Sequence, residues 1–167
     1  MTADQVTRLV REERIIRGVD FRGLVLEDMV LADKVFWFCN LSRIQMRRVR
    51  IENVKIRLSF FDFGSFDSCQ AIRCDIRNSV FAGSRFAACR VEETLMHRDN
   101  FLGVETSESL FLASDLYASC FTAARLEGVT FRDCNLKRVE FRRALLSRTD
   151  FPASNPGEAY MEEALRR

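Results

Sequence analysis

The sequence predicts an all-β fold: a coil in which short β-strand sides alternate with corners. Large apolar residues recur at every fifth position from 21 to 151, small residues recur two positions earlier, and mostly polar residues fill the rest. A period of five fits neither an amphipathic helix nor an ordinary alternating strand, because every fifth residue would drift around the helix and change faces on the strand. A coil that turns a corner after each unit keeps these positions inside.

The large apolar class is the strongest signal. Counting by fives from Phe21 to Phe151 gives 27 positions, and only Ala71 and Thr106 are not large and apolar. Twelve of the 15 phenylalanines fall in this class, where an even spread over the five classes would place three. We therefore expect one uninterrupted repeat domain over residues 19–153, with these side chains in a buried core.

The positions two residues before the large apolar ones are mostly small. Strand alternation puts positions two apart on the same face, so both classes should point inward. Five of the six cysteines belong to the small class, which suits Cys as a small buried hydrophobe. Lys34 and Asp99 are the main exceptions, and Asp99 is expected to face inward.

Length and charge limit the class of protein. The chain has 167 residues, which suits a single domain, and its net charge of +2 gives no overall attraction to nucleic acid or anionic membranes. Cysteines without an export signal favour a reducing compartment, and no apolar run approaches the roughly 18 residues of a membrane span. We expect a soluble, cytoplasmic protein without a membrane span.

Several units share a finer pattern of a small residue, Asp or Asn, and a large apolar residue. They are Cys39-Asn40-Leu41, Cys74-Asp75-Ile76, Asp99-Asn100-Phe101, Ser114-Asp115-Leu116, Cys134-Asn135-Leu136 and Thr149-Asp150-Phe151. Over about four fifths of its length the sequence resembles the pentapeptide-repeat family. Units such as Val54-Lys55-Ile56 lack the central Asp or Asn, which affects the outer surface rather than the fold.

The resemblance implies a right-handed quadrilateral parallel β-helix with four units per turn, so that the 27 units make about 6.75 turns. Residues 20 apart would then stack. One internal column would hold Phe21, Leu41, Phe61, Phe81, Phe101, Phe121 and Phe141. Asp99 would lie between Ser79 and Ser119, whose hydroxyls would hydrogen-bond it. Cys69 and Cys89 would stack as plain core residues, an interpretation that we favour over a disulfide or a thiol metal site.

Both ends are expected to be helical. Residues 1–18 should form a capping helix, because Thr2 and Gln5 have capping-box spacing and Gly18 would end the helix. Its apolar face would hold Val6, Leu9, Val10 and Ile16. Residues 154–167 should form a second helix with Asn155 as N-cap, Pro156 first and Glu158 third. Its face, with Tyr160, Met161, Ala164 and Leu165, either closes the rod or pairs with a second copy, as C-terminal helices do in some members of the family.

Catalytic motifs are absent from the sequence. There is one histidine, and no Gly-rich phosphate loop, zinc-spaced CxxC pair or nucleophile elbow occurs. His97 falls at a corner near Tyr117 and Arg77, where a solvated residue is the simpler interpretation. We therefore expect no enzyme, no cofactor and no metal.

Two groups of outward residues are candidates for binding. A corner row alternates aromatic and basic residues with little acid nearby: Trp37, Arg57, Arg77, His97, Tyr117 and Lys137. Lys55, Arg98 and Arg138 strengthen it, and Asp75 and Asp115 dilute it. Such a row suits an acidic protein surface or phosphates, although an ordinary solvated face is the alternative.

The second group lies near one corner of the early turns, beside Trp37 and Leu58. It consists of the three phenylalanines outside the core class, Phe38, Phe60 and Phe63. Exposed aromatic clusters mark contacts with a partner or a second copy, and irregular local packing is the alternative.

The sequence thus favours a non-catalytic protein-interaction scaffold or adaptor that binds an unidentified protein partner through the aromatic and basic face. A homodimer through the C-terminal helix or the aromatic corner is a further option, and direct nucleic-acid binding is not expected. The family resemblance also implies an alternative, a DNA-mimicking regulator or protector of a type II topoisomerase (gyrase). That role relies on a strongly acidic face, whereas the acids here are scattered among arginines.

Overall fold

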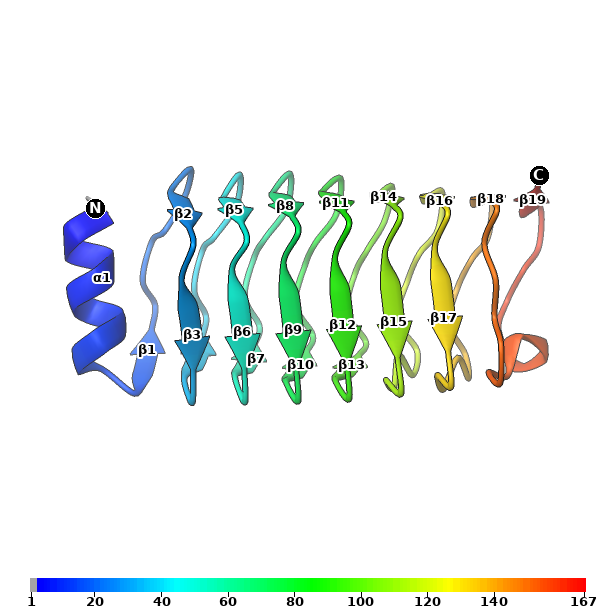
Figure 1. The fold of residues 1–167 in the computed structure, drawn as a ribbon. Coiled ribbons are helices and arrows are strands. Elements are labelled where there is room, and N and C mark those ends of the chain that lie inside the picture. Colours follow the sequence, from blue (N-terminus) through cyan, green and yellow to red (C-terminus); the bar gives the residue numbers. More distant parts are fainter. Residues whose placement is uncertain (1–2) are drawn as a thin grey trace.

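The chain forms a rod of stacked, four-sided β-coils, as the computed structural model in Figure 1 shows. It describes residues 3–167, and only the backbone of residues 3, 4 and 7. Each residue pairs in parallel with the residue 20 positions later, as Ile15 does with Val35. From Ile15 to Arg166 the coil makes about 7.6 turns, and the two termini lie at opposite ends of the rod. The predicted all-β parallel coil is confirmed.

Three of the four sides are regular parallel sheets. The first side contains β1 (Ile15–Arg17), β4 (Val35–Trp37), β7 (Lys55–Arg57), β10 (Asp75–Arg77) and β13 (Leu95–His97). The third side contains β2 (Val25–Glu27), β5 (Gln45–Arg47), β8 (Ser65–Asp67), β11 (Arg85–Ala87), β14 (Glu105–Ser107), β16 (Arg125–Glu127), β18 (Leu145–Ser147) and β19 (Leu165–Arg166). The fourth side contains β3 (Val30–Ala32), β6 (Arg50–Glu52), β9 (Gln70–Ile72), β12 (Arg90–Glu92), β15 (Leu110–Leu112) and β17 (Thr130–Arg132).

The second side is a ladder of single bridges. Its paired residues are Asp20, Asn40, Phe60, Val80, Asn100, Cys120, Glu140 and Tyr160. On every side the chain turns the corner through one residue in the left-handed region, and this residue recurs every fifth position from Gly18 to Ala153 with φ between 45° and 67°. Side chains at these corner positions project away from the core, so that they define the edges of the rod.

The core is formed by the residues that recur at every fifth position from 21 to 151. Of the 27 predicted positions 23 are buried, and the other four are partly buried. Those four are Ile51, Ala71, Phe86 and Phe151. Behind the second side the rings stack turn on turn, with centroids 4.7 Å apart for Phe61 and Phe81 and 4.9 Å for Phe81 and Phe101. The predicted aromatic column is therefore confirmed in this part of the rod.

The small inward residues satisfy the backbone at the corners. Serine hydroxyls accept a backbone N–H from the turn before, as Ser84 Oγ does from Gly64 at 3.0 Å. The same hydroxyl donates to the carbonyl of Phe61 at 2.7 Å. A small side chain at this position thus closes two hydrogen bonds inside the shaft, which a buried hydroxyl requires.

The N-terminal lid is present but shorter than predicted. Helix α1 (Ala3–Glu12) buries Val6 and Val10 against the first turn, with exposed fractions of 1% and 7%. Thr2 of the expected capping box lies outside the described residues. Ile16 does not belong to the helix: it is the buried residue of β1, and Gly18 is the first corner. The coil therefore begins at residue 15 rather than 19.

The predicted C-terminal helix is wrong. Only a single 3-10 turn forms, at Pro156–Glu158, and Asn155 makes no side-chain cap bond to it. The chain then resumes the coil: Tyr160 bridges to Glu140, and β19 pairs with β18. The coil forms here instead of a helix because residues 159–165 continue the five-residue period. They also form backbone hydrogen bonds with the preceding turn, such as Leu165 N–H to Ala144 O at 2.9 Å.

Candidate interaction surface

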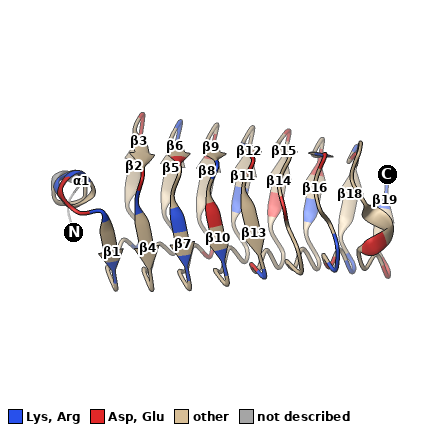
Figure 2. Cartoon of the chain, turned by 90° about the horizontal axis from the view of Figure 1, so that it is seen from below, with Lys and Arg blue, Asp and Glu red and all other residues tan. Residues whose placement is uncertain are grey.

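The predicted row of aromatic and basic residues lies where the strands of the first side end and the chain turns toward the second side. Figure 2 shows two of these strands, β7 and β10, with their basic residues in blue. Parallel register aligns its members between Arg17 and His97 turn by turn. We call the following set the corner row: Arg17, Trp37, Arg57, Arg77, His97, Tyr117 and Lys137. Arg17 was missed from sequence because residues 1–18 were assigned to a helix, although it lies one 20-residue turn before Trp37.

The N-terminal end of the corner row is an aromatic platform. Trp37 is 41% exposed, and the Arg17 guanidinium carbon lies 5.2 Å from its ring centroid. Phe38 stacks beside it at 5.9 Å with an interplanar angle of 13°. Leu58, on the next turn, is 40% exposed. The platform therefore offers flat apolar surface with a cation at its edge, an arrangement that suits contact with another molecule.

In the middle of the row one acid pairs with two basic residues, which leaves a net charge of +1. Asp75 binds the guanidinium groups of both neighbours, Arg77 through Nε at 2.6 Å and Arg57 through Nη2. Burial acts to raise the pKa of Asp75, but the hydrogen bonds from Arg77 and Arg57 outweigh it and hold the pKa below its ordinary value. Asp75 therefore engages two basic groups of the row, whereas the sequence predicted only that it would reduce the local positive charge.

The C-terminal part of the corner row brings His97 and Tyr117 together, as expected. Their ring centroids are 6.0 Å apart in an edge-on arrangement. His97 Nε2 lies 2.9 Å from Asp115 Oδ2 but not in hydrogen-bonding direction. Arg138 donates to the Tyr117 hydroxyl at 3.3 Å and thereby lowers the pKa of that phenol. These contacts hold the side chains at the C-terminal end of the corner row in place, and they do not form a cleft around His97.

Some basic groups beside the row stay available. Lys55 and Arg98 are exposed and have no ion pair among residues 3–167. Lys137 is 3.8 Å from Glu158, a distance too long for a hydrogen bond. The corner row therefore combines one aromatic end, a middle in which Asp75 pairs with two arginines, and exposed basic groups beside it.

The phenylalanines outside the core class do not gather at one corner, contrary to the prediction. Phe38 and Leu58 stand at the corner between the first and second sides. Phe60 points out from the middle of the second side and is 47% exposed, and Phe63 stands at the far corner and is 63% exposed. The group spans the whole second side, because corners recur every five residues and positions 58 and 63 occupy successive ones.

The residues of the predicted C-terminal dimer contact also lie apart from one another. Tyr160 is on the second side, Leu165 is on the third side, and Met161 is partly buried between them. Without a helix these residues share no common face, so the dimer contact expected from helical spacing is wrong in that form.

Asp99 is buried, as predicted, with 1% of its surface exposed. The expected hydroxyl partners are wrong: the backbone N–H of Ser79 donates to Asp99 Oδ1 at 2.8 Å, and Asp99 N–H donates to Ser119 Oγ at 2.9 Å. The two hydroxyls donate instead to carbonyls, of Arg77 and Met96. Oδ2 has no partner within the described chain, and burial raises the pKa of Asp99 to about 8.

The stacked cysteines are free thiols that bond to the backbone. Cys69 Sγ donates to the carbonyl of Met46, and Cys89 Sγ donates to that of Phe66, each at 3.4 Å. Burial raises the pKa of Cys134 to about 11. Residues 3–167 contain no group of three or more His, Cys, Asp or Glu side chains placed to hold a metal ion. No helix in this range is long and apolar enough to cross a membrane.

Comparison with protein families gives one match: residues 114–155 fit the family described as pentapeptide repeats, in eight copies. No curated protein matches the chain.

Solved structures with a similar coil include pentapeptide-repeat proteins. A trypsin-treated variant of QnrB1, a plasmid-mediated fluoroquinolone resistance protein, is 15% identical, with 92% of this chain and 89% of that chain covered and a TM-score of 0.44. HetL from Nostoc sp. strain PCC 7120, involved in heterocyst differentiation regulation, is 11% identical, with 98% and 96% covered and a TM-score of 0.31. A protein of the Arabidopsis thaliana thylakoid lumen is 24% identical over 46% of this chain and 57% of its own, with a TM-score of 0.40.

Proposed function

We propose that this chain, a pentapeptide-repeat protein, is a non-catalytic interaction scaffold that binds a protein partner along the corner row. The exposed platform of Trp37, Phe38 and Arg17 carries the proposal. A tryptophan that is 41% exposed, stacked on a second ring and flanked by a guanidinium, is typical of an interface anchor.

The charges around the platform favour a partner with acidic groups. Asp75 is already bonded to two arginines, whereas Lys55 and Arg98 have no ion pair within the described part of the chain. A carboxylate of a partner would meet positive charge without having to displace an internal acid from it. Such steering raises association rates and falls with salt concentration.

The rest of the surface supports a binding role rather than catalysis. The interior is filled by side chains. Asp75 is bonded to two arginines, and His97 and Asp115 lie together on the outer surface beside Tyr117, whereas the buried Asp99 lies in the shaft. General acid–base catalysis needs such groups to line a cleft that holds a substrate.

Affinity capture from the native lysate tests the proposal. Trp37→Ala and Arg98→Glu should each release the partner, with a loss of about thirtyfold or more in affinity for the tryptophan, in the range of an interface hot spot. Arg132→Glu, on the fourth side and equally exposed, is the matched control and should retain it. If Trp37→Ala and Arg98→Glu both leave every captured protein bound, the surface is wrong.

A second function, protection of a type II topoisomerase by DNA mimicry, is suggested by the resistance role of QnrB1. DNA presents one negative charge about every 1.7 Å. Here acids on the third side and its corner are paired with arginines on an adjacent turn, such as Asp28 with Arg48 at 2.6 Å and Glu105 with Arg85 at 2.9 Å. We therefore place this function second. Inhibition of gyrase supercoiling by micromolar protein would reverse the order.

A further inference from the structure

The centre of the second side is uncharged, although 30% of the chain's residues are charged. No Asp, Glu, Lys or Arg occupies its outward positions over the three successive turns from Val80 to Ala123. We call the following set the central patch: Val80, Ala82, Gly83, Asn100, Leu102, Gly103, Cys120, Thr122 and Ala123. Most of these side chains are small, and Leu102, 45% exposed, is the largest of them.

Two phenylalanines project at the N-terminal edge of the central patch. Phe60 is 47% exposed and Phe63 63%. Phe63 also occupies a corner with φ of 56°, where a bulky residue is disfavoured. Its ring lies over Gly83, where a Cβ atom would come within 2.7 Å of Cε1. Neither the backbone conformation nor burial within the chain favours a phenylalanine at position 63. We therefore expect its apolar surface to be covered by another molecule.

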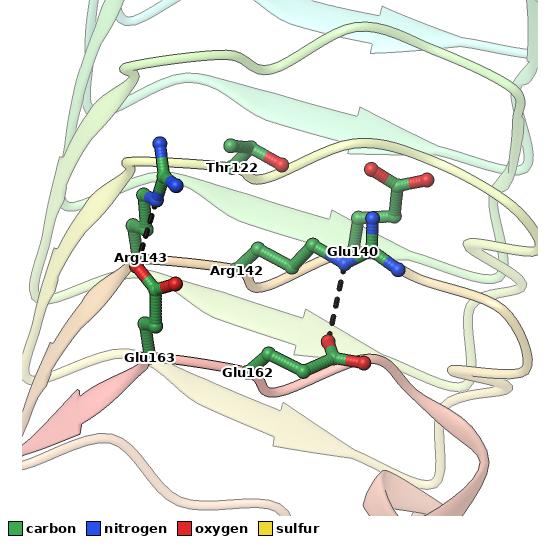
Figure 3. Close-up of a pocket in the computed structure, with 6 residues that line it drawn as sticks. All are labelled: Thr122, Glu140, Arg142, Arg143, Glu162 and Glu163. Atoms are coloured by element: carbon green, nitrogen blue, oxygen red, sulfur yellow. Dashed lines mark hydrogen bonds and ion pairs between the residues drawn. The ribbon is translucent and has the colours of Figure 1, made fainter.

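The two ends of the second side carry opposite net charges over their two outermost turns. At the N-terminal end Arg22 pairs with Asp20, and Arg43, which has no ion pair within residues 3–167, leaves a net charge of +1. At the C-terminal end, shown in Figure 3, Arg142 and Arg143 pair with Glu162 and Glu163 of the next turn, at 3.1 and 2.8 Å. Glu140 has no ion pair in the same range and leaves a net charge of −1. Asp62, on the turn of Phe60, also lacks an ion pair in this range, and its Oδ1 accepts a hydrogen bond from Ser42 Oγ at 2.7 Å.

We propose that two copies of this chain pack side by side through their second sides, in antiparallel orientation. A two-fold axis at the middle of the side places the turn of Phe60 against the turn of Cys120 of the second copy. The projecting Phe63 then meets the small residues Gly103 and Ala123, and the end with Arg43 meets the end with Glu140. A parallel pair would instead set the phenylalanines on one another and like charges face to face.

The area available is sufficient for such a pair. The chain exposes 8702 Å², so one of its four sides offers roughly 2,000 Å², more than the ~800 Å² per partner of a standard interface. The contact uses the second side and leaves the aromatic platform of the corner row free at its edge. The pairing therefore goes beyond the proposed scaffold function and does not depend on the partner.

Sedimentation velocity between about 1 and 100 µM, combined with small-angle X-ray scattering, tests the proposal. We expect a dimer of about 39 kDa, twice 19.4 kDa, whose maximum dimension is close to that of a single rod. Phe63→Asn removes the projecting ring and fits the left-handed corner, and Gly103→Arg places a large cation in the central patch. Each should weaken the dimer at least about a hundredfold.

The controls separate this pairing from other contacts. Val30→Thr removes an exposed apolar residue from the fourth side and should leave the dimer unchanged, as should Trp37→Ala. Circular dichroism checks that each variant keeps its fold. A chain that stays monomeric throughout the range would overturn the proposal, as would a dimer that survives both Phe63→Asn and Gly103→Arg. So would an elongated, end-to-end dimer that Leu165→Asp dissociates.

Discussion

Replacing Asp99 with serine should stabilise the protein, and by more at higher pH. Each inward position in this column offers an oxygen to the backbone N–H of the turn before: Ser59 accepts from Cys39, Ser79 from Ser59, and Asp99 from Ser79. A serine at 99 keeps that acceptor. Its hydroxyl can also donate to a nearby carbonyl, as Ser79 Oγ does, whereas Asp99 Oδ2 has no partner within the described residues.

The magnitude follows from the pKa of Asp99, which burial raises from 3.8 to about 8. Below pH 4 the carboxyl is protonated in both the folded and the unfolded chain, so its titration does not change the free energy of unfolding. Between pH 4 and 8 the unfolded chain releases the proton and the folded chain keeps it, so the free energy of unfolding falls by about 1.4 kcal/mol per pH unit. Above pH 8 both states are ionised and the loss levels off. Arg57 and Asp75 act on this pKa in opposite directions and leave burial dominant.

Urea unfolding at pH 5, 6, 7 and 8 measures the effect. The difference in unfolding free energy between Asp99→Ser and the parent should grow with pH, by roughly 4 kcal/mol between pH 5 and 8. Comparing two proteins at each pH cancels the titration of groups that both share. A difference that stays constant over this range would refute the buried, protonated carboxyl. A parent that becomes more stable with rising pH relative to the variant would reverse the sign and refute it too.

Four further outcomes are expected. Phe101→Asp should abolish cooperative thermal unfolding, because its ring stacks on both neighbours at 4.9 and 4.6 Å and an unpaired charge would replace it, whereas Ala113→Asp at an exposed corner should change stability by less than about 0.5 kcal/mol. At dilutions where the chain is monomeric, Phe63→Asn should raise the free energy of unfolding by about 0.5–1 kcal/mol in urea titrations, since asparagine tolerates positive φ better. At the same dilutions, where the chain is monomeric, iodoacetamide should modify Cys120 first in the folded protein, as peptide mass spectrometry would show, because the other five thiols are buried. Arg48→Ala should cost under about 1 kcal/mol in thermal melts, because its ion pair with Asp28 is solvent-exposed on both sides.

The core could be predicted from sequence because a single period decides which side chains face inward. The same period extends beyond the range assigned to it: Ile16 is five residues before Phe21, and Met161 is 20 residues after Phe141. Sequence reasoning instead places Ile16 on the apolar face of a helix that ends at Gly18, and Met161 on a helix that starts at Asn155 and Pro156. The coil prevails at the C-terminus because an existing turn supplies backbone partners, as Phe141 N–H does to Tyr160 O at 2.8 Å.

The corner row could be predicted only in outline. A turn of 20 residues, once known, fixes which residues align, and His97 does lie beside Tyr117. Spacing does not fix where a long side chain ends. Arg57 and Arg77 converge on Asp75, which occupies a strand position between them on the same side. The positive charge without an ion pair among the described residues therefore lies with Arg17, Lys55 and Arg98 rather than with Arg57 and Arg77.

The corners give the physical reason to regard the exposed aromatics as a contact surface. Each corner residue adopts positive φ, which costs a bulky side chain about 1 kcal/mol and costs glycine little; Gly83 and Gly103 occupy two such corners. Phe38, Leu58 and Phe63 take the same conformation at φ of 53°, 49° and 56°, and each is at least 40% exposed. An isolated rod would be more stable with small or polar residues at all three positions. Burial against another molecule reverses that balance, because covering one such side chain contributes roughly 1.5–3 kcal/mol, which exceeds the backbone cost.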